Sequence, residues 1–300
     1  MAAILPDTAA PRLVALCRAP SEGRAILGPM STLTVRRLLA DLDTPPPRHW
    51  AGDAFRTAFF NALSMSFPLG EQLFIESVKK GMAALPPDQQ ARFADEVQGF
   101  IGQEATHRHV HGRFNAHLLR QGLVNRWEAR IESRRGDVEA LDVRNWVAVT
   151  AATEHLTAVF AEYMLSHPRV LGGAEGRLQD LWMWHSAEES EHRSTAFDLY
   201  AALGGAHAWR VGIFRAVLRL FLLDLARQTL RNLVSDGSWW RPSTWAGAWR
   251  LLYGRDGFMR FSRPRWQLYL REDFHPSQGD GAMANAWLAA NAARVPPVRA

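Results

Sequence analysis

Residues 185–198 read HSAEESEHRSTAFD, a stretch dense in glutamate and histidine within an otherwise apolar and helix-forming region. Glu189 and His192 are three residues apart, so on a helix they lie on one face, one turn from each other. The same spacing recurs upstream at Glu104 and His107, in the sequence GQEATH. One Glu-x-x-His pair is a weak signal, whereas the repeated pair indicates that both copies serve one purpose.

A single glutamate precedes each pair at a helix-hairpin distance: Glu71 before the first pair and Glu154 before the second. Both stand in apolar surroundings, where a carboxylate without a partner is costly. Helix bundles that hold two metal ions use this set: a glutamate from each of two helices and a Glu-x-x-His from each of the other two. Four carboxylates offset the charge of two divalent ions, and two imidazoles add nitrogen ligands. We therefore expect the ligands to be Glu71, Glu104, His107, Glu154, Glu189 and His192.

Alternating β-branched runs hardly occur, so the sequence predicts an all-α protein built as a four-helix bundle with additional C-terminal helices. Proline and glycine punctuation places the four long helices at about Pro68–Leu85, Asp88–Gly122 with Asp88 as N-cap, Val138–Ser166 and Ala174–Leu203. Shorter helical pieces follow, broken by Pro242, Pro264 and Pro276. The expected domains are a poorly structured segment at 1–50, the di-metal bundle at 51–204, and an amphipathic Trp/Arg-rich region at 205–300.

Several side chains near the expected ligands have open roles. His111 and His185 share the ligand faces, and each is a further ligand, a proton shuttle or a core histidine. Glu188 is placed to replace Glu189 as a ligand, and His155 and Asp198 are weaker neighbours. We expect Glu191, Arg193, His109 and His117 on the exterior. A third Glu-x-x-His, Glu272 and His275, precedes Pro276 and is left out of the site.

Composition limits the classes of function. A chain of 300 residues with 47% apolar content builds a substantial core, and its one cysteine, Cys17, excludes a disulfide framework and favours a reducing compartment. The N-terminus lacks the features of a secretory signal, and charges interrupt the longest apolar run at 211–234. We therefore expect a cytoplasmic protein without a spanning helix.

The region after residue 205 is rich in tryptophan and arginine, and the net charge of the chain is +5. No nucleic-acid-binding motif accompanies this charge, so we expect no nucleic-acid partner. The region either packs on the bundle or contacts the inner membrane surface, because tryptophan and arginine favour the headgroup zone. The sequence leaves both alternatives open, together with a homodimer.

Five ordered motifs resemble the bacterial family called predicted metal-dependent hydrolases. They are GDAFRTAFFNALSMSFPLGEQLFIESV, FIGQEATHRHVHGRFN, TEHLTAVFAEYML, WHSAEESEHRSTAFDLY and YLREDFHP, and they cover roughly residues 50–276. The resemblance implies a ferritin-like fold and supports the six glutamate and histidine ligands. It leaves the reaction open, since the hydrolase label of that family is itself a prediction.

Three functions fit a centre of this type. Mixed carboxylate and imidazole ligands suit iron, with manganese or zinc as alternatives, so we rank oxidation of a hydrophobic organic substrate by O2 first. Hydrolysis of an ester, amide or lactone by a metal-activated water is the alternative, and non-catalytic metal binding comes last. An apolar chamber is expected from the aromatic residues Phe59, Phe60, Phe67, Phe74, Phe100, Phe160, Trp182 and Trp184.

Overall fold

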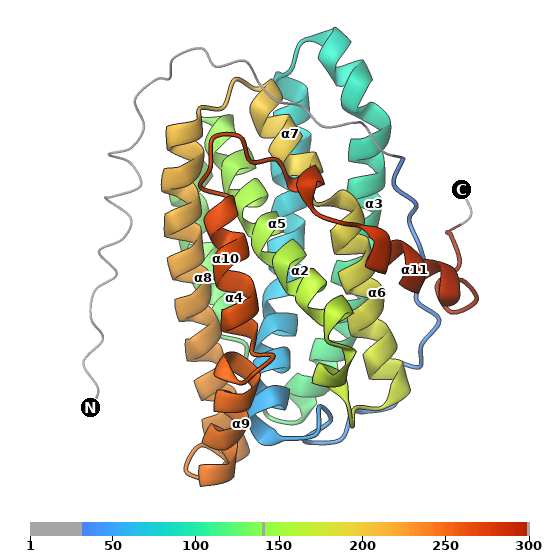
Figure 1. The fold of residues 1–300 in the computed structure, drawn as a ribbon, viewed down its shortest axis with the longest axis vertical. Coiled ribbons are helices and arrows are strands. Elements are labelled where there is room, and N and C mark those ends of the chain that lie inside the picture. Colours follow the sequence, from blue (N-terminus) through green and yellow to red (C-terminus); the bar gives the residue numbers. More distant parts are fainter. Residues whose placement is uncertain (1–31, 140–141, 299–300) are drawn as a thin grey trace.

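The computed structural model describes residues 32–139 and 142–298, and Cys17 lies outside this part of the chain. The described residues form α-helices, two short 3-10 helices and connecting turns, and they contain no strand beyond one isolated bridge between Arg36 and Pro297. The prediction of an all-α protein is confirmed (Figure 1).

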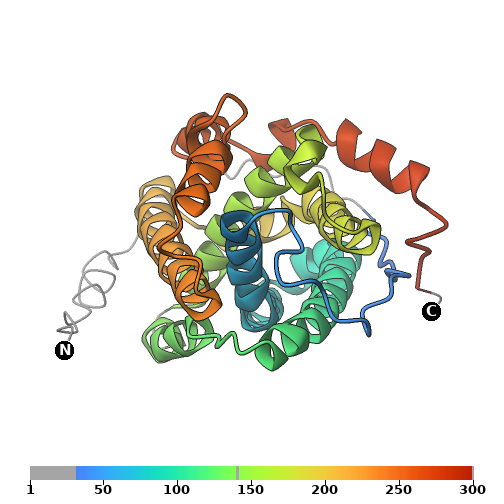
Figure 2. The same cartoon turned by 90° about the horizontal axis from the view of Figure 1, so that it is seen from below.

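Four long helices form the centre of the molecule: α2 (Ala54–Ala84), α3 (Pro87–Arg120), α5 (Val143–Ser166) and α6 (Gly176–His192). Helix α2 packs against α3 and α5, and α5 packs against α6. Figure 2 looks along these helices and shows α2, in blue, surrounded by the others. The buried residues of the four helices are mostly apolar, so the glutamates and histidines among them stand out.

Further helices cover this core. They are α4 (Trp127–Glu139), α7 (Thr195–Ala202), α8 (His207–Asp236), α9 (Pro242–Tyr253), α10 (Phe258–Leu268) and α11 (Ala282–Ala290). Helix α8 lies along α2 and α5, and α11 lies on α6 at the opposite side of the molecule (Figure 1). Among the described residues, no helix has both the length and the apolar character that a membrane span requires.

Helix α2 begins well before the predicted start at Pro68. Asp53 caps it, with Oδ1 accepting a hydrogen bond from Arg56 N at 2.8 Å. Pro68 lies inside the helix, where its missing N–H leaves the carbonyl four residues earlier without the usual donor. That carbonyl belongs to Ser64, and Asn115 Nδ2 donates to it at 2.8 Å. A side chain of α3 therefore replaces the lost main-chain bond, which the local sequence did not indicate.

Other predicted boundaries also need correction. Helix α3 begins at Pro87 with Pro86 as cap, so Asp88 lies in the first turn. The region predicted as one helix at Val138–Ser166 begins only at Val143, because Asp142 caps it by accepting from Arg144 N. Pro264 lies inside α10 and does not end it.

The helix predicted at Ala174–Leu203 is interrupted after His192, and α7 starts at Thr195. The buried Thr195 Oγ1 donates to Glu96 Oε1 at 2.8 Å, which holds the start of α7 against α3. The interruption follows the second Glu-x-x-His directly, so both members of that pair still belong to the continuous helix α6.

Residues 33–42 form an extended segment that lies over α3. It is joined to residues 294–298 by three main-chain hydrogen bonds, from Arg37 N to Pro296 O, from Leu39 N to Arg294 O, and from Val298 N to Val35 O. Two helical glycines make room for it: a Cβ at Gly99 would lie 2.6 Å from Leu33 Cβ, and one at Gly102 would lie 2.3 Å from Val35 Cγ2. This segment brings main-chain and side-chain groups to the centre described below.

Candidate metal centre

The six predicted ligands converge in the core from four helices. Glu71 comes from α2, Glu104 and His107 from α3, Glu154 from α5, and Glu189 and His192 from α6. All six are at most 4% exposed. Lateral packing of the four helices brings them together, because each ligand occupies the inward face of its helix.

The ligand atoms fall into overlapping groups. Glu71, His107 and His185 form one group, and Glu104, Glu154 and His192 form another; within each, the atoms lie within 4.8 Å of one another. Glu104 also groups with His107 and Glu189. His192 Nε2 lies 3.1 Å from Glu104 Oε1 and 3.3 Å from Glu154 Oε2. Ligands at about 2.1 Å from a common ion are separated by roughly these distances.

Many polar atoms of this cluster lack hydrogen-bond partners, which is the strongest sign that it fits cations. Among the described residues, both carboxylate oxygens of Glu71, Glu104 and Glu154 are buried without such a bond. The same holds for Glu189 Oε2, for His107 Nδ1 and for His192 Nε2. A buried polar group without a partner costs about 1–3 kcal/mol. Two divalent ions would satisfy these atoms together and neutralise the four carboxylates.

Burial and mutual repulsion perturb the charges of the cluster when it holds no cation. Burial, followed by repulsion from Glu104, raises the pKa of Glu71 well above its usual range. Burial likewise raises the pKa of Glu154 to about 7. Burial opposes protonation of His192, but Glu154 and Glu189 outweigh it and raise the pKa of His192 well above its usual value. The cluster therefore attracts positive charge. A proton would supply part of this charge, and metal ions would supply more of it.

Gln103 fixes the orientation of His192. Its Nε2 donates to Thr34 O at 3.0 Å and to Glu191 Oε2 at 2.8 Å, and both of these partners are acceptors. Its Oε1 therefore faces His192 Nδ1, at 2.9 Å, and accepts a hydrogen bond from the Nδ1–H group. Nε2 is therefore the ring nitrogen that faces the carboxylates, and it would offer its lone pair to a bound cation in place of a proton.

Glu188 has the corresponding place beside His107. Its Oε2 lies 2.9 Å from His107 Nε2, and its Oε1 accepts from Arg36 Nη1 at 3.2 Å. Burial raises the pKa of Glu188 to about 8, and Arg36 counteracts this rise. With Nε2 of His107 bonded to Glu188, Nδ1 is the nitrogen that faces the cluster. Glu188 thus contacts an imidazole on the side away from the other carboxylates.

A chain of hydrogen bonds orients His185. Asn115 donates through Nδ2 to a carbonyl, so its Oδ1 accepts the Ser64 hydroxyl proton at 2.7 Å. Ser64 Oγ then accepts from His111 Nδ1 at 2.8 Å, and His111 Nε2 accepts from His185 Nδ1 at 2.7 Å. In the neutral ring of His185, Nε2 then carries the lone pair, 2.9 Å from Glu189 Oε1. A lone pair opposite a carboxylate is unfavourable unless a cation interacts with both, so His185 fits as a third imidazole ligand.

Two predicted neighbours of the centre bond elsewhere. His155 packs among Phe214, Tyr269 and Phe274, and its Nε2 contacts the carbonyl of Arg265 at 3.2 Å. Burial lowers the pKa of His155 to about 4, so it is a neutral core residue at neutral pH.

The second of these neighbours, Asp198, is buried, and its Oδ1 lies 2.8 Å from His275 Nε2. His275 itself lies outside any helix, as expected from Pro276. The third Glu-x-x-His is therefore separate from the cluster.

Some residues expected on the exterior are not there. Glu191 is half-buried and bonds Arg36 in a bidentate pair at 2.7 and 2.9 Å, because the extended segment covers this face of α6. Arg193 is half-buried and donates to Gly279 O. His117 is buried, with Nε2 2.8 Å from Leu42 O. Only His109 is exposed as expected.

Four residues that orient the ligands were not predicted from the sequence: Gln103, Ser64, Asn115 and Arg36. The first three lie on ligand-bearing helices, Gln103 next to Glu104, Ser64 two turns before Glu71 and Asn115 about two turns after His107, so helical spacing offered a weak signal. Arg36 lies far from the motifs in sequence and gave no such signal.

The fold and the cluster together define an all-α protein with a candidate metal centre of glutamates and histidines. A family model described as "Predicted metal-dependent hydrolase" matches residues 34–280. The chain therefore belongs to the family of predicted metal-dependent hydrolases, as the motifs indicated. Neither the curated proteins nor the solved structures include a match to this chain.

Proposed function

We propose that this protein is a hydrolase with two divalent metal ions bound between α2, α3, α5 and α6. The observation that carries the proposal is the convergence of buried carboxylates and imidazole lone pairs that have no other partner. The arrangement fits the ferritin-like bundles that hold two metals with glutamates and Glu-x-x-His pairs. The proposed ligands are Glu71, Glu104, His107, Glu154, His185, Glu189 and His192.

The proposed reaction is hydrolysis of an ester, amide or lactone. When bound, the ions would supply Lewis acidity, which lowers the pKa of a coordinated water and polarises a carbonyl group. The surrounding residues keep the imidazoles in the tautomers that expose a lone pair: Gln103 acts on His192, Glu188 on His107, and His111 on His185. Such partners typically contribute 10- to 100-fold in metal affinity or activity.

Hydrolysis replaces oxidation as the favoured reaction. Ligand type alone ranked an O2-dependent oxidation first, but the family to which the chain belongs is described as hydrolytic. The additional imidazole of His185 also makes the ligand set suitable for zinc and manganese, as well as iron. The proposal therefore covers zinc, manganese and iron as the metal ions.

The test uses the full chain, stripped of metal and reloaded with Zn(II), Mn(II) or Fe(II) under anaerobic conditions. Nitrophenyl esters and lactones serve as probes. We expect two metal ions per chain and hydrolysis without O2. Glu104→Ala should lose metal and activity, whereas Glu272→Ala, which alters the separate Glu-x-x-His, should retain both. Turnover that requires Fe(II) and consumes O2 would overturn the proposal. Binding of two ions without hydrolysis of any probe would also overturn it and would show that the protein only binds metal.

A further inference from the structure

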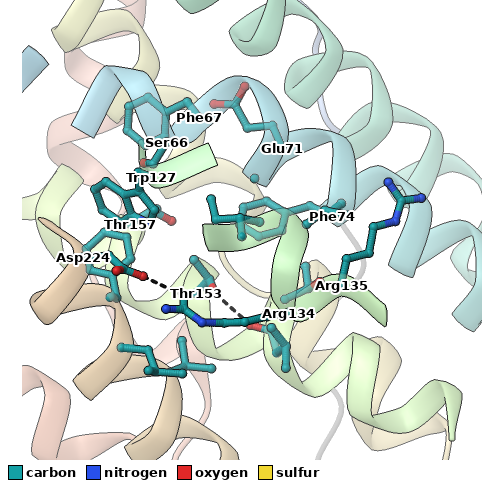
Figure 3. Close-up of a pocket in the computed structure, with 18 of the residues that line it drawn as sticks. Ser66, Phe67, Glu71, Phe74, Trp127, Arg134, Arg135, Thr153, Thr157 and Asp224 are labelled. Atoms are coloured by element: carbon teal, nitrogen blue, oxygen red, sulfur yellow. Dashed lines mark hydrogen bonds and ion pairs between the residues drawn. The ribbon is translucent and has the colours of Figure 1, made fainter. Parts of the chain in front are cut away.

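A largely apolar pocket of about 370 Å³ lies between α2, α4, α5 and α8 (Figure 3). Its volume is within the range of small-molecule sites, about 300–1,000 Å³. Phe67 and Phe74 of α2, Trp127 of α4, and Phe221 of α8 form much of its wall. Of the predicted aromatic chamber, Phe67 and Phe74 line this pocket.

The pocket reaches the candidate metal centre at one point. Glu71 lines it and also belongs to a metal-binding group, whereas the other proposed ligands do not line it. Figure 3 shows Glu71 at the end of the pocket away from Arg134 and Asp224. A molecule in the pocket therefore has the metal centre at one end and the paired charges of α4 and α8 at the other.

The polar side chains at the end of the pocket away from Glu71 already have partners. Arg134 Nη1 bonds Asp224 Oδ2 at 2.6 Å, and Arg135 Nη2 bonds Glu76 Oε2 at 2.8 Å. The hydroxyl of Thr153 donates to a carbonyl of its own helix, at 2.9 Å. Because these groups are satisfied, the part of the pocket beyond Glu71 selects for an apolar group and offers no free charge to a carboxylate or phosphate.

We propose that this pocket binds the apolar part of an uncharged substrate and presents its scissile carbonyl at the Glu71 end. This inference rests on the proposed function for the cleavage step, but binding to the pocket does not. The substrate class is an ester, amide or lactone with an aliphatic or aromatic group buried between the four helices. Hydrolysis adds water across the carbonyl–heteroatom bond and releases an acid and an alcohol or amine.

Gly70 gives a direct test. It lines the pocket on α2, and a Cβ built there would have no atom within 4 Å. The Cβ of Gly70→Leu therefore meets no neighbour and its side chain is expected to extend into the pocket, and leucine favours the helix more than glycine does. Gly112→Leu is the matched control, since Gly112 is an exposed glycine in helix α3 with the same free space around its Cβ.

The first measurement is binding of a neutral apolar fluorophore, N-phenyl-1-naphthylamine, followed by energy transfer from Trp127 and Trp146 in the wall. We expect saturable binding to the unmodified protein and to Gly112→Leu, and a loss of at least about tenfold in Gly70→Leu, because the added side chain occupies the same space. Metal content should be equal in all three proteins. Equal binding to Gly70→Leu would overturn the proposal.

The second measurement is hydrolysis of nitrophenyl esters of increasing acyl length by the metal-loaded protein. Each buried methylene should raise kcat/KM about three- to fourfold until the pocket is filled. Gly70→Leu should move the preferred length to shorter chains. If fluorophore binding follows the prediction but no ester is cleaved, the assignment of the pocket as an apolar binding site is supported and the hydrolase proposal fails. If esters are cleaved with an unchanged length preference in Gly70→Leu, the pocket assignment fails.

A different observation supports a second site, at the end of the molecule formed by the α8–α9 junction and α9. Its exposed aromatic residues, here called the aromatic face, are between 47% and 65% exposed: Trp239, Trp240, Trp245, Trp249 and Tyr253. Trp245, Trp249 and Tyr253 are spaced by four residues along α9, so they share one side of that helix. Exposed apolar groups gathered in this way mark an interaction surface.

Basic side chains surround the aromatic face. Arg241 and Arg250 are exposed beside it, and the guanidinium of Arg241 lies 5.8 Å from the ring of Trp240. Tryptophan and tyrosine favour the interface between water and lipid, and arginine adds attraction to anionic headgroups. We infer that the aromatic face binds the surface of an anionic lipid bilayer. A second copy of this chain is the alternative occupant.

Sedimentation with vesicles of phosphatidylcholine, with or without phosphatidylglycerol, distinguishes these occupants. We expect binding to the anionic vesicles that weakens with salt and falls at least about tenfold in a Trp240→Ser/Trp249→Ser variant. Leu39→Ser is the control, because Leu39 is 52% exposed in the extended segment at 33–42, where its main chain pairs with Arg294. Absence of vesicle binding, or a dimer in light scattering that the double variant dissociates, would overturn the lipid assignment.

Discussion

Replacing Gln103 with leucine should weaken one half of the metal centre and leave the other half intact. Gln103 is fully buried, and leucine has a similar size. The change removes the acceptor for His192 Nδ1, at 2.9 Å, and two donations from Nε2. Thr34 O and Glu191 still accept hydrogen bonds from Arg36. The Nδ1–H group of His192 is therefore the one group that is left without a hydrogen-bond partner.

The size of the effect follows from that single loss. A buried donor without an acceptor costs about 1–3 kcal/mol, so the melting temperature should fall by roughly 2–5 °C for a chain of this length. If His192, Glu104 and Glu154 coordinate an ion as proposed, that ion should bind 10- to 100-fold more weakly, because a histidine without its outer partner is a poorer ligand. The ion next to His107 and Glu71 should bind as before.

The assay is titration of the metal-free protein with Zn(II) in competition with a chromophoric chelator, which resolves the two binding steps. Gln90→Leu is the control, since Gln90 makes a half-buried bond to Leu85 O at the far end of the same helix. Only one step should weaken in Gln103→Leu. Two unchanged steps, or equal weakening of both, would refute the argument that Gln103 acts through His192.

Three further predictions concern stability. Removing the metal ions should lower the melting temperature by roughly 9 °C in calorimetry, since each of two ions at about 100 times its Kd contributes about 2.7 kcal/mol; an unchanged transition would contradict metal binding. His155, whose pKa falls to about 4 in the folded chain, contributes stability that is fully present above pH 6.5 and is lost as pH falls toward 4, about 3 kcal/mol in total. Thermal scans of metal-free His155→Phe should therefore show a weaker loss of stability between pH 7 and pH 4.5 than the unmodified chain, and parallel curves would count against it. Asn115→Ala should lower the urea midpoint by an amount equivalent to about 1–3 kcal/mol, because the Ser64 carbonyl opposite Pro68 loses its donor; an equal midpoint would show that water replaces this bond.

The helical class and the main ligand pattern were accessible from sequence because they depend on local spacing. Glu104 and His107 are one turn apart whatever the tertiary structure, and so are Glu189 and His192. The duplicated pattern then pointed to facing helices. The six predicted ligands do meet in one buried cluster, and their role as metal ligands stays a prediction.

The groups that orient the ligands depend on contacts between distant segments. Arg36 reaches Glu188 and Glu191 across more than 150 residues, and no periodicity reveals such a contact. For the same reason Glu191 was placed wrongly on the exterior. The start of α2 was misjudged because Pro68 is a helix breaker by local rules, and its compensating donor comes from another helix.

The extended segment at 33–42 should detach before the helices unfold when the protein is heated. It supplies Thr34 O to Gln103 and Arg36 to Glu188, so two of the three imidazoles depend on it for their orientation. It is joined to residues 294–298 by three main-chain hydrogen bonds, and peripheral pairs of this kind open at a lower free energy than packed helices. Warming should therefore release the imidazoles while the helices remain folded, and the protein should lose its metal ions before it loses its helical circular dichroism.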